Sequence, residues 1–584
     1  MCGIWGITSN NIDFIEACLS ESNHRGPDGK GIWHSDQITL GHNLLSITDQ
    51  PSSSSQPWHT PRGNILIYNG EIFNYSLLLE EFKDIFTPKT SCDTELLAWG
   101  LDYFGLDFID KLDSMHAFAY YEVNRKYVTL SRDISGIKPL YFSHIPEGIM
   151  FGSEVAPLLD RDGLNGLDEL SFFSSVNLGL NPFNQTIFSK ILKLLSGETR
   201  TYDINKNKFI FKKRNIIQPS SNLTFKNIQS LQEQLRFEFA HSVKSCTLGY
   251  RSFGVFLSGG MDSSAIAYEL DKQNIDFQTY TTDFPDTRSF IKRILGRGRD
   301  FNIDANLAKK LSFDINKKNN QLRFSKEEFL SRYKSAVLHL GEPVYSQSLP
   351  LYHFANQQIA QNDTTVTLAG DGGDEVLGGY QKYFYLNEMK ISSFSDLLKI
   401  WLNRFASLGI KSNSKYTLND VHDYLLESTP SEIWNPEDPV NSYMALDVAY
   451  QLPEDFFHRN DSYGMRFSLE GRFPFATKRF LKFAMSIPSI YKLGNTAGKG
   501  KKIFRDAYDG LLPKYITNAP KAGWTSPTSE WDKDADFLSL QSLAANRNIP
   551  FINNDISELN SKEKNFLLHL YILCNEYKLN NDNS

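Results

Sequence analysis

The sequence predicts an α+β half built from layered β-sheets, followed by an α/β half with a parallel sheet and a helical C-terminal part. Three observations lead to this order. Short segments rich in β-branched and aromatic residues fill roughly the first 160 residues, and strand-like and helix-like segments alternate from about residue 229. Helical spacing of apolar residues dominates beyond about residue 380.

The expected strands of the first half have turn residues at their ends. They are GNILIYNGEI (63–72), HAFAYYEV (116–123) and KYVTLSRD (126–133). A polar, lysine-rich stretch follows near residues 203–228 and is typical of a connection between domains. We therefore expect a first domain over 2–200, a linker over 201–228 and a second domain over 229–584.

The second half begins with a helical pattern over 228–246. GVFLSGG (254–260) follows and predicts a buried strand that ends in a glycine turn. TTVTLAGDGG (364–373) repeats this strand-and-turn pattern. Because ligands of parallel α/β sheets bind at the carboxyl ends of the strands, both turns are candidate ligand sites.

Composition is that of an ordinary folded chain, with 41% hydrophobic and 22% charged residues and a net charge of −7. This balance predicts no nucleic-acid and no membrane partner. No apolar run approaches the roughly 18 residues of a membrane span, and the N-terminus lacks the basic region of a signal peptide, so we expect a cytoplasmic protein. Five scattered cysteines without CxxC spacing support neither a disulfide framework nor a zinc site.

Cys2 stands directly after the initiator methionine. After Met removal, its α-amine, with an ordinary pKa of about 7.7–8.0, could serve as the base for its own thiol. The alternative is a buried cysteine at the start of a strand. MCGIWGI is followed in order by HRGPDG (24–29), YNGEIFNY (68–75), SCDTE (91–95) and SRDISGIKPLYF (131–142).

With these motifs the first half resembles the class II glutamine amidotransferases, which are N-terminal-nucleophile amidases. The resemblance implies that Cys2 is the nucleophile and that Asn69 and Gly70 hold the oxyanion. It also implies that Asp93 binds the α-amino group of glutamine and that Glu71 lines the same pocket.

GHNLLSI (41–47) departs from the family pattern, because Leu44 stands where an arginine clamps the glutamine α-carboxylate. Three interpretations remain open. Another cation supplies the clamp, glutamine binds weakly, or the glutaminase is vestigial.

LSGGMDSS (257–264) offers successive backbone N–H groups at a helix N-terminus, which can cradle phosphate, and Asp262 can bind Mg²⁺. A plain glycine turn with helix caps is the alternative. The motif resembles the pyrophosphate loop of the ATP-pyrophosphatase family and lacks the GxxxxGK[ST] of a Walker A loop. The implied ATP-binding residues are Leu257, Ser258, Gly259, Gly260, Asp262, Ser263 and Ser264.

LAGDGGDEVLGGY (368–380) resembles a motif of the asparagine synthetases. The resemblance places Gly370 in the ATP site, makes Asp374 a second Mg²⁺ ligand and gives Asp371 the role of general base on ammonia. Glu375 completes the acidic cluster.

Three further segments match that family: GEPVYSQSLPLY (341–352), SLEGRFPF (468–475) and KKIFRDAYDGLLP (501–513). They imply that Lys501 stabilises negative charge on pyrophosphate or the acyl intermediate, with Lys521 as a possible support. Either lysine could instead be a solvated surface charge.

Other positions differ from the family. The segment 461–465 lacks an arginine, Thr477 replaces an aspartate, and RSFIKRILGRGR (288–299) is strongly basic. The basic segment could be a mobile lid, a contact to a large anionic substrate or a solvated loop.

Taken together, the chain resembles the glutamine-dependent asparagine synthetases. This implies an ATP- and Mg²⁺-dependent ligase that carries ammonia from glutamine to an acyl-adenylate, with aspartate as the default acceptor, and with a possible homodimer. Alternatives are the same chemistry on a uronic acid or a secondary-metabolite acid, intramolecular amide formation, or a non-catalytic binding protein built on a decayed synthetase.

Overall fold

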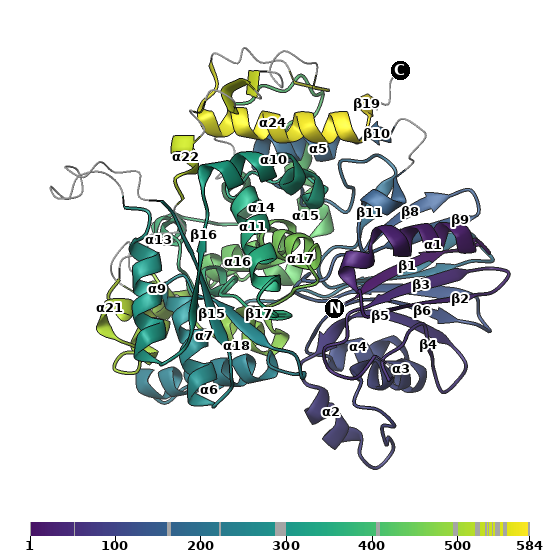
Figure 1. The fold of residues 1–584 in the computed structure, drawn as a ribbon, viewed down its shortest axis with the longest axis horizontal. Coiled ribbons are helices and arrows are strands. Elements are labelled where there is room, and N and C mark those ends of the chain that lie inside the picture. The colour runs from purple at the N-terminus through teal and green to yellow at the C-terminus, as the bar shows by residue number, and fades with distance from the viewer. Residues whose placement is uncertain are drawn as a thin grey trace.

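The protein is described by a computed structural model, shown as a ribbon in Figure 1. The described residues are 2–51, 53–159, 165–220, 223–285, 300–403, 409–494, 500–519, 526–531, 534, 537–539, 541–542, 549–552 and 558–581. Lys521 and the basic segment 288–299 lie outside them.

The first half contains two antiparallel sheets of six strands each (Figure 1). The first sheet has the order β11 (Ile191–Lys193), β8 (Tyr141–Ile145), β9 (Gly148–Gly152), β1 (Gly3–Ile7), β3 (Thr39–Leu44), β2 (Gly29–His34). The second has the order β13 (Lys208–Arg214), β12 (Glu198–Asp203), β7 (Tyr127–Arg132), β6 (Ser114–Glu122), β5 (Ile65–Ile72), β4 (Trp58–His59).

An apolar core lies between the two sheets. Alternate residues of β5 and β7, such as Ile65, Ile67, Val128 and Leu130, join apolar residues of the first sheet in one cluster. Helix α1 (Ile12–Glu21) packs on β1 and β3, while α2 (Tyr75–Phe82), α3 (Asp93–Phe104) and α4 (Phe108–Lys111) belong to the helical layer on the second sheet. The predicted α+β fold with layered sheets is therefore confirmed.

The second half is organised around a parallel sheet of five strands. Its order is β16 (Asn319–Arg323), β15 (Gln278–Asp283), β14 (Phe253–Phe256), β17 (Val366–Leu368), β18 (Glu470–Arg472). The strand predicted from GVFL is β14, the central strand. Since the chain runs directly from β14 and β17 into the two predicted glycine turns, both turns lie at the carboxyl edge of the sheet.

Helices surround this sheet and make up most of the chain beyond residue 380 (Figure 1). One packed group contains α6 (Ile228–Ser245), α7 (Met261–Lys272), α18 (Lys478–Ser486) and α20 (Lys502–Ala507). Another contains α10 (Lys326–Leu340), α11 (Leu349–Ala360), α17 (His458–Met465) and α24 (Ser561–Glu576).

The remaining elements connect these groups. They include α5 (Glu169–Leu178), α9 (Ile303–Asp314), α12 (Gly373–Leu377), α13 (Gln381–Asn387), α14 (Phe394–Asn403), α15 (Leu418–Ser428), α16 (Pro439–Leu446), the π-helix η5 (Asp447–Phe457), α19 (Ser489–Leu493), α21 (Lys514–Thr517) and α22 (Thr528–Trp531). A two-stranded parallel sheet pairs β10 (Asn165–Leu167) with β19 (Leu579–Asn581). In the described part of the chain, no helix is long and apolar enough to cross a membrane.

The expected linker over 201–228 differs from the structure in its first part. Residues 208–214 form β13, which pairs with β12 at the edge of the second sheet. Its lysines are mostly exposed, as is common for an edge strand. Because the segment is polar, its sequence resembles that of a connection between domains.

Candidate active sites

The turn after β14 forms one wall of a cavity in the second half. Gly259 has a φ of 76°, and a Cβ on it would lie 2.5 Å from the carbonyl oxygen of Asp304. Only glycine can therefore occupy this position. The turn is held by Ser258 Oγ and Ser263 Oγ, which lie 3.1 Å apart, and α7 begins directly after it. Asp262 and Ser263, in the first turn of α7, line the cavity.

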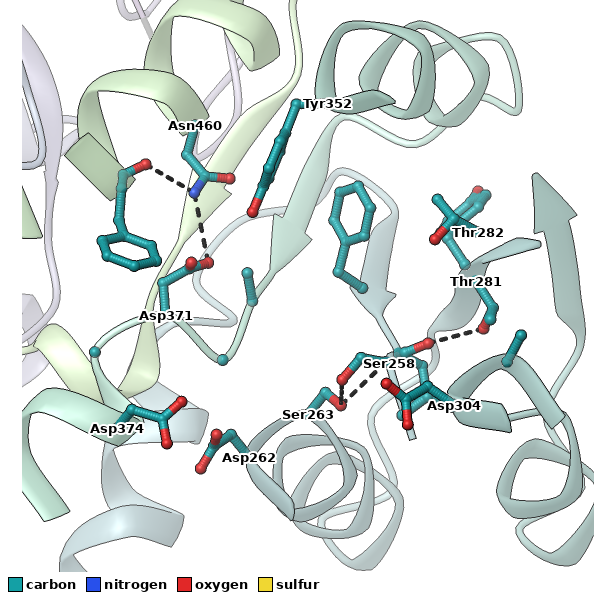
Figure 2. A pocket seen from close by; sticks show the side chains of 18 of the residues that line it. Ser258, Asp262, Ser263, Thr281, Thr282, Asp304, Tyr352, Asp371, Asp374 and Asn460 are labelled. Carbon is teal, nitrogen blue, oxygen red and sulfur yellow. Dashed lines mark hydrogen bonds between the residues drawn. The ribbon is translucent and has the colours of Figure 1, made fainter. Parts of the chain in front are cut away.

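The turn after β17 approaches the first turn closely. A Cβ on Gly370 would lie 2.8 Å from the Cβ of Asp262, and a Cβ on Gly373 would lie 2.7 Å from Asp262 Oδ1. The two glycine-rich motifs are therefore packed against each other, with Asp262 between them. Figure 2 shows Asp262 and Asp374 side by side below Asp371.

Lys501 joins the two aspartates. Its Nζ lies 2.7 Å from Asp374 Oδ1 and also contacts Asp262 Oδ2. Burial by itself lowers the pKa of the ammonium, but the two carboxylates outweigh it and raise the pKa of Lys501 above its usual range, so the side chain is charged. Lys501 has a φ of 61°, a conformation that costs a non-glycine residue free energy and is often found at functional sites.

The two carboxylates fit a magnesium ion bound together with phosphate. Both carboxylates contact the same group, the ammonium of Lys501. Mg²⁺ is commonly held by one or two carboxylates with phosphate oxygens and water completing its shell. Across the residues that the structure describes, no cluster of three or more His, Cys, Asp or Glu side chains forms a complete protein cage for a metal. Asp262 and Asp374 thus suit a metal that arrives with a phosphate ligand.

The cavity has a volume of about 300 Å³ and extends from these aspartates to two further groups of side chains. In Figure 2, Thr281, Thr282 and Asp304 lie on one side, and Asp371, Asn460 and Tyr352 lie on the other. Asp262 and Asp374 form a third region of the cavity, below Asp371 at the lower left of the view.

Asp371 is half-buried in the cavity wall, where Asn460 Nδ2 donates to its Oδ2 at 3.4 Å. Burial raises the pKa of Asp371 to about 6, although the nearby Arg459 opposes the shift. Burial and the neighbouring Asp374 raise the pKa of Glu375 to about 7, and Tyr380 donates to Glu375 at 2.7 Å. A carboxyl group with a pKa near 6 is suited to accept a proton at neutral pH.

The second candidate site lies where β1 and β5 meet in the first half. The backbone N of Cys2 lies 2.9 Å from Asn69 Oδ1, and both residues are buried. Asn69 Nδ2 is buried as well and finds no hydrogen-bond partner among the described residues. A buried amide donor without a partner costs free energy unless a ligand completes it, so Asn69 is suited to stabilise a developing oxyanion.

Gly70 and Asp93 complete this site. A Cβ on Gly70 would lie 2.3 Å from the Met115 carbonyl oxygen, so a side chain cannot be accommodated. Asp93 accepts hydrogen bonds from Tyr68 Oη at 2.9 Å and from the backbone N of Ile72 at 3.0 Å. Burial raises the pKa of Asp93 to about 6, although both hydrogen bonds oppose the shift.

Leu44 is buried at the end of β3, where its carbonyl oxygen accepts a hydrogen bond from the backbone N of Asp28 at 2.9 Å. A guanidinium from the second half lies close by. Arg251 Nε donates to the Ser46 carbonyl at 2.8 Å, and its Nη2 lies 2.8 Å from Asp28 Oδ2. The turn after Leu44 therefore carries a cation that the sequence pattern did not identify.

Two buried arginines connect the first-half site to the second half, and neither was assigned a role from the sequence. Arg472 on β18 binds Glu71 at 2.9 Å, and Arg25 binds Asp461 of α17 at 2.9 Å. Arg25 Nε also donates to the carbonyl of Cys2 at 3.2 Å. Both arginines lie in family motifs, HRGPDG and SLEGRFPF. The sequence therefore shows these arginines but does not indicate which acids they pair with.

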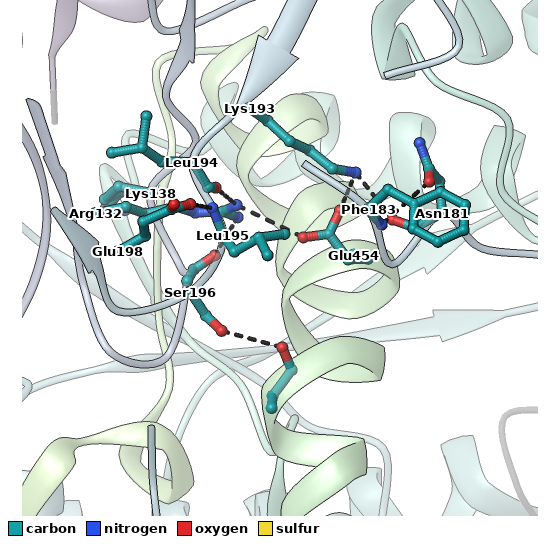
Figure 3. Close-up of polar contacts among 12 residues, drawn as sticks. Arg132, Lys138, Asn181, Phe183, Lys193, Leu194, Leu195, Ser196, Glu198 and Glu454 are labelled. Carbon is teal, nitrogen blue, oxygen red and sulfur yellow. Dashed lines mark hydrogen bonds and ion pairs between the residues drawn. The ribbon is translucent and has the colours of Figure 1, made fainter. Parts of the chain in front are cut away.

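A third contact between the halves is a buried network around Glu454 of η5. Figure 3 shows Lys193 and Arg132 on either side of this carboxylate. Lys193 contacts Glu454 Oε2 and donates to the Asn181 carbonyl at 3.0 Å, while Arg132 Nη1 lies 3.6 Å from Glu454 Oε1. Burial lowers the pKa of Lys193, but Glu342 and Glu454 outweigh it and raise the pKa, so the pairing is ionic.

Two known protein families match different parts of the chain. Residues 1–214 match a family described as a glutamine amidotransferase domain, and residues 234–556 match a family described as asparagine synthase. Asparagine synthetase [glutamine-hydrolyzing] 1 of Bacillus subtilis is 25% identical, over 91% of this chain and 88% of that protein. Asparagine synthetase B [glutamine-hydrolyzing] of Escherichia coli is 26% identical, over 88% and 80%. Amidase chry2 of Gibberella zeae is 23% identical, over 92% and 88%.

Proposed function

Because this chain belongs to the glutamine-dependent asparagine synthetase family, we propose that it is a ligase that forms a carboxamide from a carboxylic acid, ATP and the amide nitrogen of glutamine. The observation that carries the proposal is the meeting of Asp262 and Asp374 at Lys501, in a cavity that also contains Asp371. Aspartate is the acceptor that the names of the relatives suggest.

In the first half, we propose that glutamine is hydrolysed to glutamate and ammonia. The thiol of Cys2 attacks the side-chain amide, and Asn69 Nδ2 with the N–H of Gly70 stabilises the oxyanion. Once the initiator Met is removed, the α-amine of Cys2 can take the thiol proton. Asp93 is the partner for the α-amino group of glutamine, and Glu71 lies in the same pocket, tied to Arg472.

In the second half, the acceptor carboxylate attacks the α-phosphorus of ATP, an acyl-adenylate forms and pyrophosphate leaves. Mg²⁺, when bound, would be held by Asp262 and Asp374 and would neutralise phosphate charge. The glycine turn before α7 offers its backbone N–H groups to phosphate, with Ser263 and Ser264 in the first turn of the helix. Lys501 adds a positive charge where pyrophosphate departs.

Amide formation follows at the same carbonyl carbon. Ammonia forms the new C–N bond, the bond to AMP breaks, and Asp371 accepts the proton that the nitrogen loses. Glu375 and Tyr380 form a hydrogen-bonded pair in the same wall and can hold a second proton nearby. Enclosure in the cavity protects the acyl-adenylate from water.

The test separates the two halves. Wild type and a Cys2→Ala variant are supplied with ATP, Mg²⁺ and a panel of carboxylic acids, first with ammonium and then with glutamine, and AMP is measured. Ammonium is used first because Leu44 stands where an arginine clamp is expected. We expect acid-dependent AMP release by both proteins with ammonium, and by wild type alone with glutamine.

Two results would contradict the proposal. If no acid on the panel supports AMP release with ammonium, the chain does not perform this ligase reaction. If the Cys2→Ala variant uses glutamine as well as wild type does, Cys2 is not the source of ammonia.

A further inference from the structure

The cavity of the second half is lined by acids and uncharged side chains. Among its described lining residues there is no lysine, arginine or histidine. The five acids in the lining are Asp262, Asp304, Asp371, Asp374 and Glu375. A negatively charged group on a bound acceptor would therefore meet like charges and no described cation on the cavity surface.

Two of the described cations near the cavity are already paired. Lys501 contacts Asp262 and Asp374, at the position proposed for pyrophosphate. Arg459 lies behind the wall, where its Nε is 2.7 Å from Asp455 Oδ1. In the proposed reaction Lys501 serves the phosphates, and Arg459 is paired with Asp455, four residues before it.

The acceptor must lie in the region of Asp371, since that residue is the proposed base for ammonia. The cavity lining there includes an amide, Asn460, and two aromatic rings, Tyr352 and Phe456. Figure 2 shows Asn460 and Tyr352 close to Asp371. The guanidinium of Arg459 covers both rings, at 4.9 Å from the centroid of Tyr352 and 5.1 Å from that of Phe456. These rings offer apolar surface, and the electron-rich face of an aromatic ring attracts positive charge.

Resting on the proposed function, we propose that the acid activated here is a monocarboxylate whose remaining part is uncharged or positively charged. A second carboxylate, such as the α-carboxylate of aspartate, would be desolvated beside Asp371, and the nearby described guanidinium, that of Arg459, already pairs with Asp455. Burial of an unpaired charge and like-charge contacts are both strongly unfavourable. An amine, a hydroxyl group or an apolar chain meets no such penalty against Asn460 and the two rings.

The experiment uses acids that differ from aspartate by one group at a time. β-Alanine is aspartate without its α-carboxylate, succinate is aspartate without its amine, and butanoate replaces one carboxylate of succinate by a methyl group. Glucuronate adds a neutral, hydroxylated monocarboxylate. The full-length protein is assayed with ATP, Mg²⁺ and ammonium, and kcat/KM for acid-dependent AMP release is measured for each acid.

We expect at least one of β-alanine, butanoate and glucuronate to exceed both aspartate and succinate by tenfold or more in kcat/KM. A preference for aspartate or succinate would overturn the inference and leave the ligase reaction standing. If no acid supports AMP release, the proposed function itself fails, and the inference fails with it. The two failures are therefore distinguishable.

A matched pair of variants tests the location. Phe456→Lys adds a cation to the acceptor region, and Phe456→Met has a similar length without the charge. We expect the ratio of kcat/KM for aspartate to that for butanoate to be at least tenfold higher in the lysine variant than in the methionine variant. Equal ratios in the two variants would show that the acceptor does not lie beside Phe456 and would overturn the inference.

Discussion

Arg25 and Asp461 form an ion pair across the two halves of the molecule, with Nη2 and Oδ2 2.9 Å apart and both side chains almost completely buried. The same guanidinium donates to the carbonyl of Cys2, and Asn460, the residue before Asp461, donates to Asp371. The candidate nucleophile and the candidate base are therefore connected by a short chain of contacts through α17.

We expect an Asp461→Asn variant to lose glutaminase activity selectively. The neutral amide holds Arg25 less firmly, and a small displacement of the Cys2 backbone is expected to lower the rate of glutamate release by about tenfold or more. AMP release with ammonium should stay within about twofold of wild type. Parallel losses in both assays would mean that the ion pair serves the fold and does not position Cys2.

Removal of the Arg472 guanidinium is expected to lower the free energy of unfolding strongly. It is fully buried and binds Glu71, Glu470 and the carbonyl oxygens of Cys246 and Leu248. An Arg472→Met variant leaves two buried carboxylates without their cation, which costs roughly 3–5 kcal/mol of unfolding free energy. Urea denaturation measures this loss.

Arg479→Met is the control for that experiment. Arg479 pairs with Glu238 but its side chain is 38% exposed, so its removal should cost only about 0–1 kcal/mol. Similar losses in the two variants would contradict a special role of the buried contact to Glu71.

Lys501 and Lys502 provide a comparison between adjacent residues. Lys501 is buried between Asp262 and Asp374, whereas the Lys502 side chain is 51% exposed and pairs with Asp506. We expect Lys501→Met to lower AMP release with ammonium by about 10²–10³-fold, since it removes a charge aimed at the departing pyrophosphate. Lys502→Met should behave like wild type, and both variants should keep glutaminase activity. Equal activity of the two variants would exclude a catalytic role for Lys501.

The raised pKa of Asp371 predicts the pH dependence of amide formation. Its pKa of about 6 means that the carboxylate is present above this pH and becomes protonated below it. The rate, expressed per concentration of unprotonated ammonia, should therefore be level above about pH 7 and fall about tenfold per unit below about pH 6. A rate that stays level down to about pH 5 would show that another group accepts the proton.

The sequence predicted the elements whose signal is local. Strands β5, β6 and β7 lie in segments rich in β-branched and aromatic residues. The turns after β14 and β17 combine glycines with acidic residues, so both kinds of element could be predicted from the local sequence. The edge strand β13 escaped prediction because most of its side chains face water and nothing in its pattern requires a buried face.

The contacts that join the halves could not be predicted in the same way. Glu71 and Arg472 are separated by 401 positions, and Arg25 and Asp461 by 436. Each side chain could have paired with many others, and the choice depends on how the antiparallel sheets dock on the parallel sheet. The cation beside Leu44 was missed for the same reason, because Arg251 reaches the Ser46 carbonyl from the other half of the chain.

The bond between Arg472 and Glu71 also limits how the protein can be recombined. A chimera that takes its first 214 residues from one relative and the rest from another must bring a carboxylate and a guanidinium that match at this contact, or leave a buried charge at the junction. Exchange of glutaminase modules between such enzymes is therefore expected to succeed only when β5 and β18 are transferred as a compatible pair.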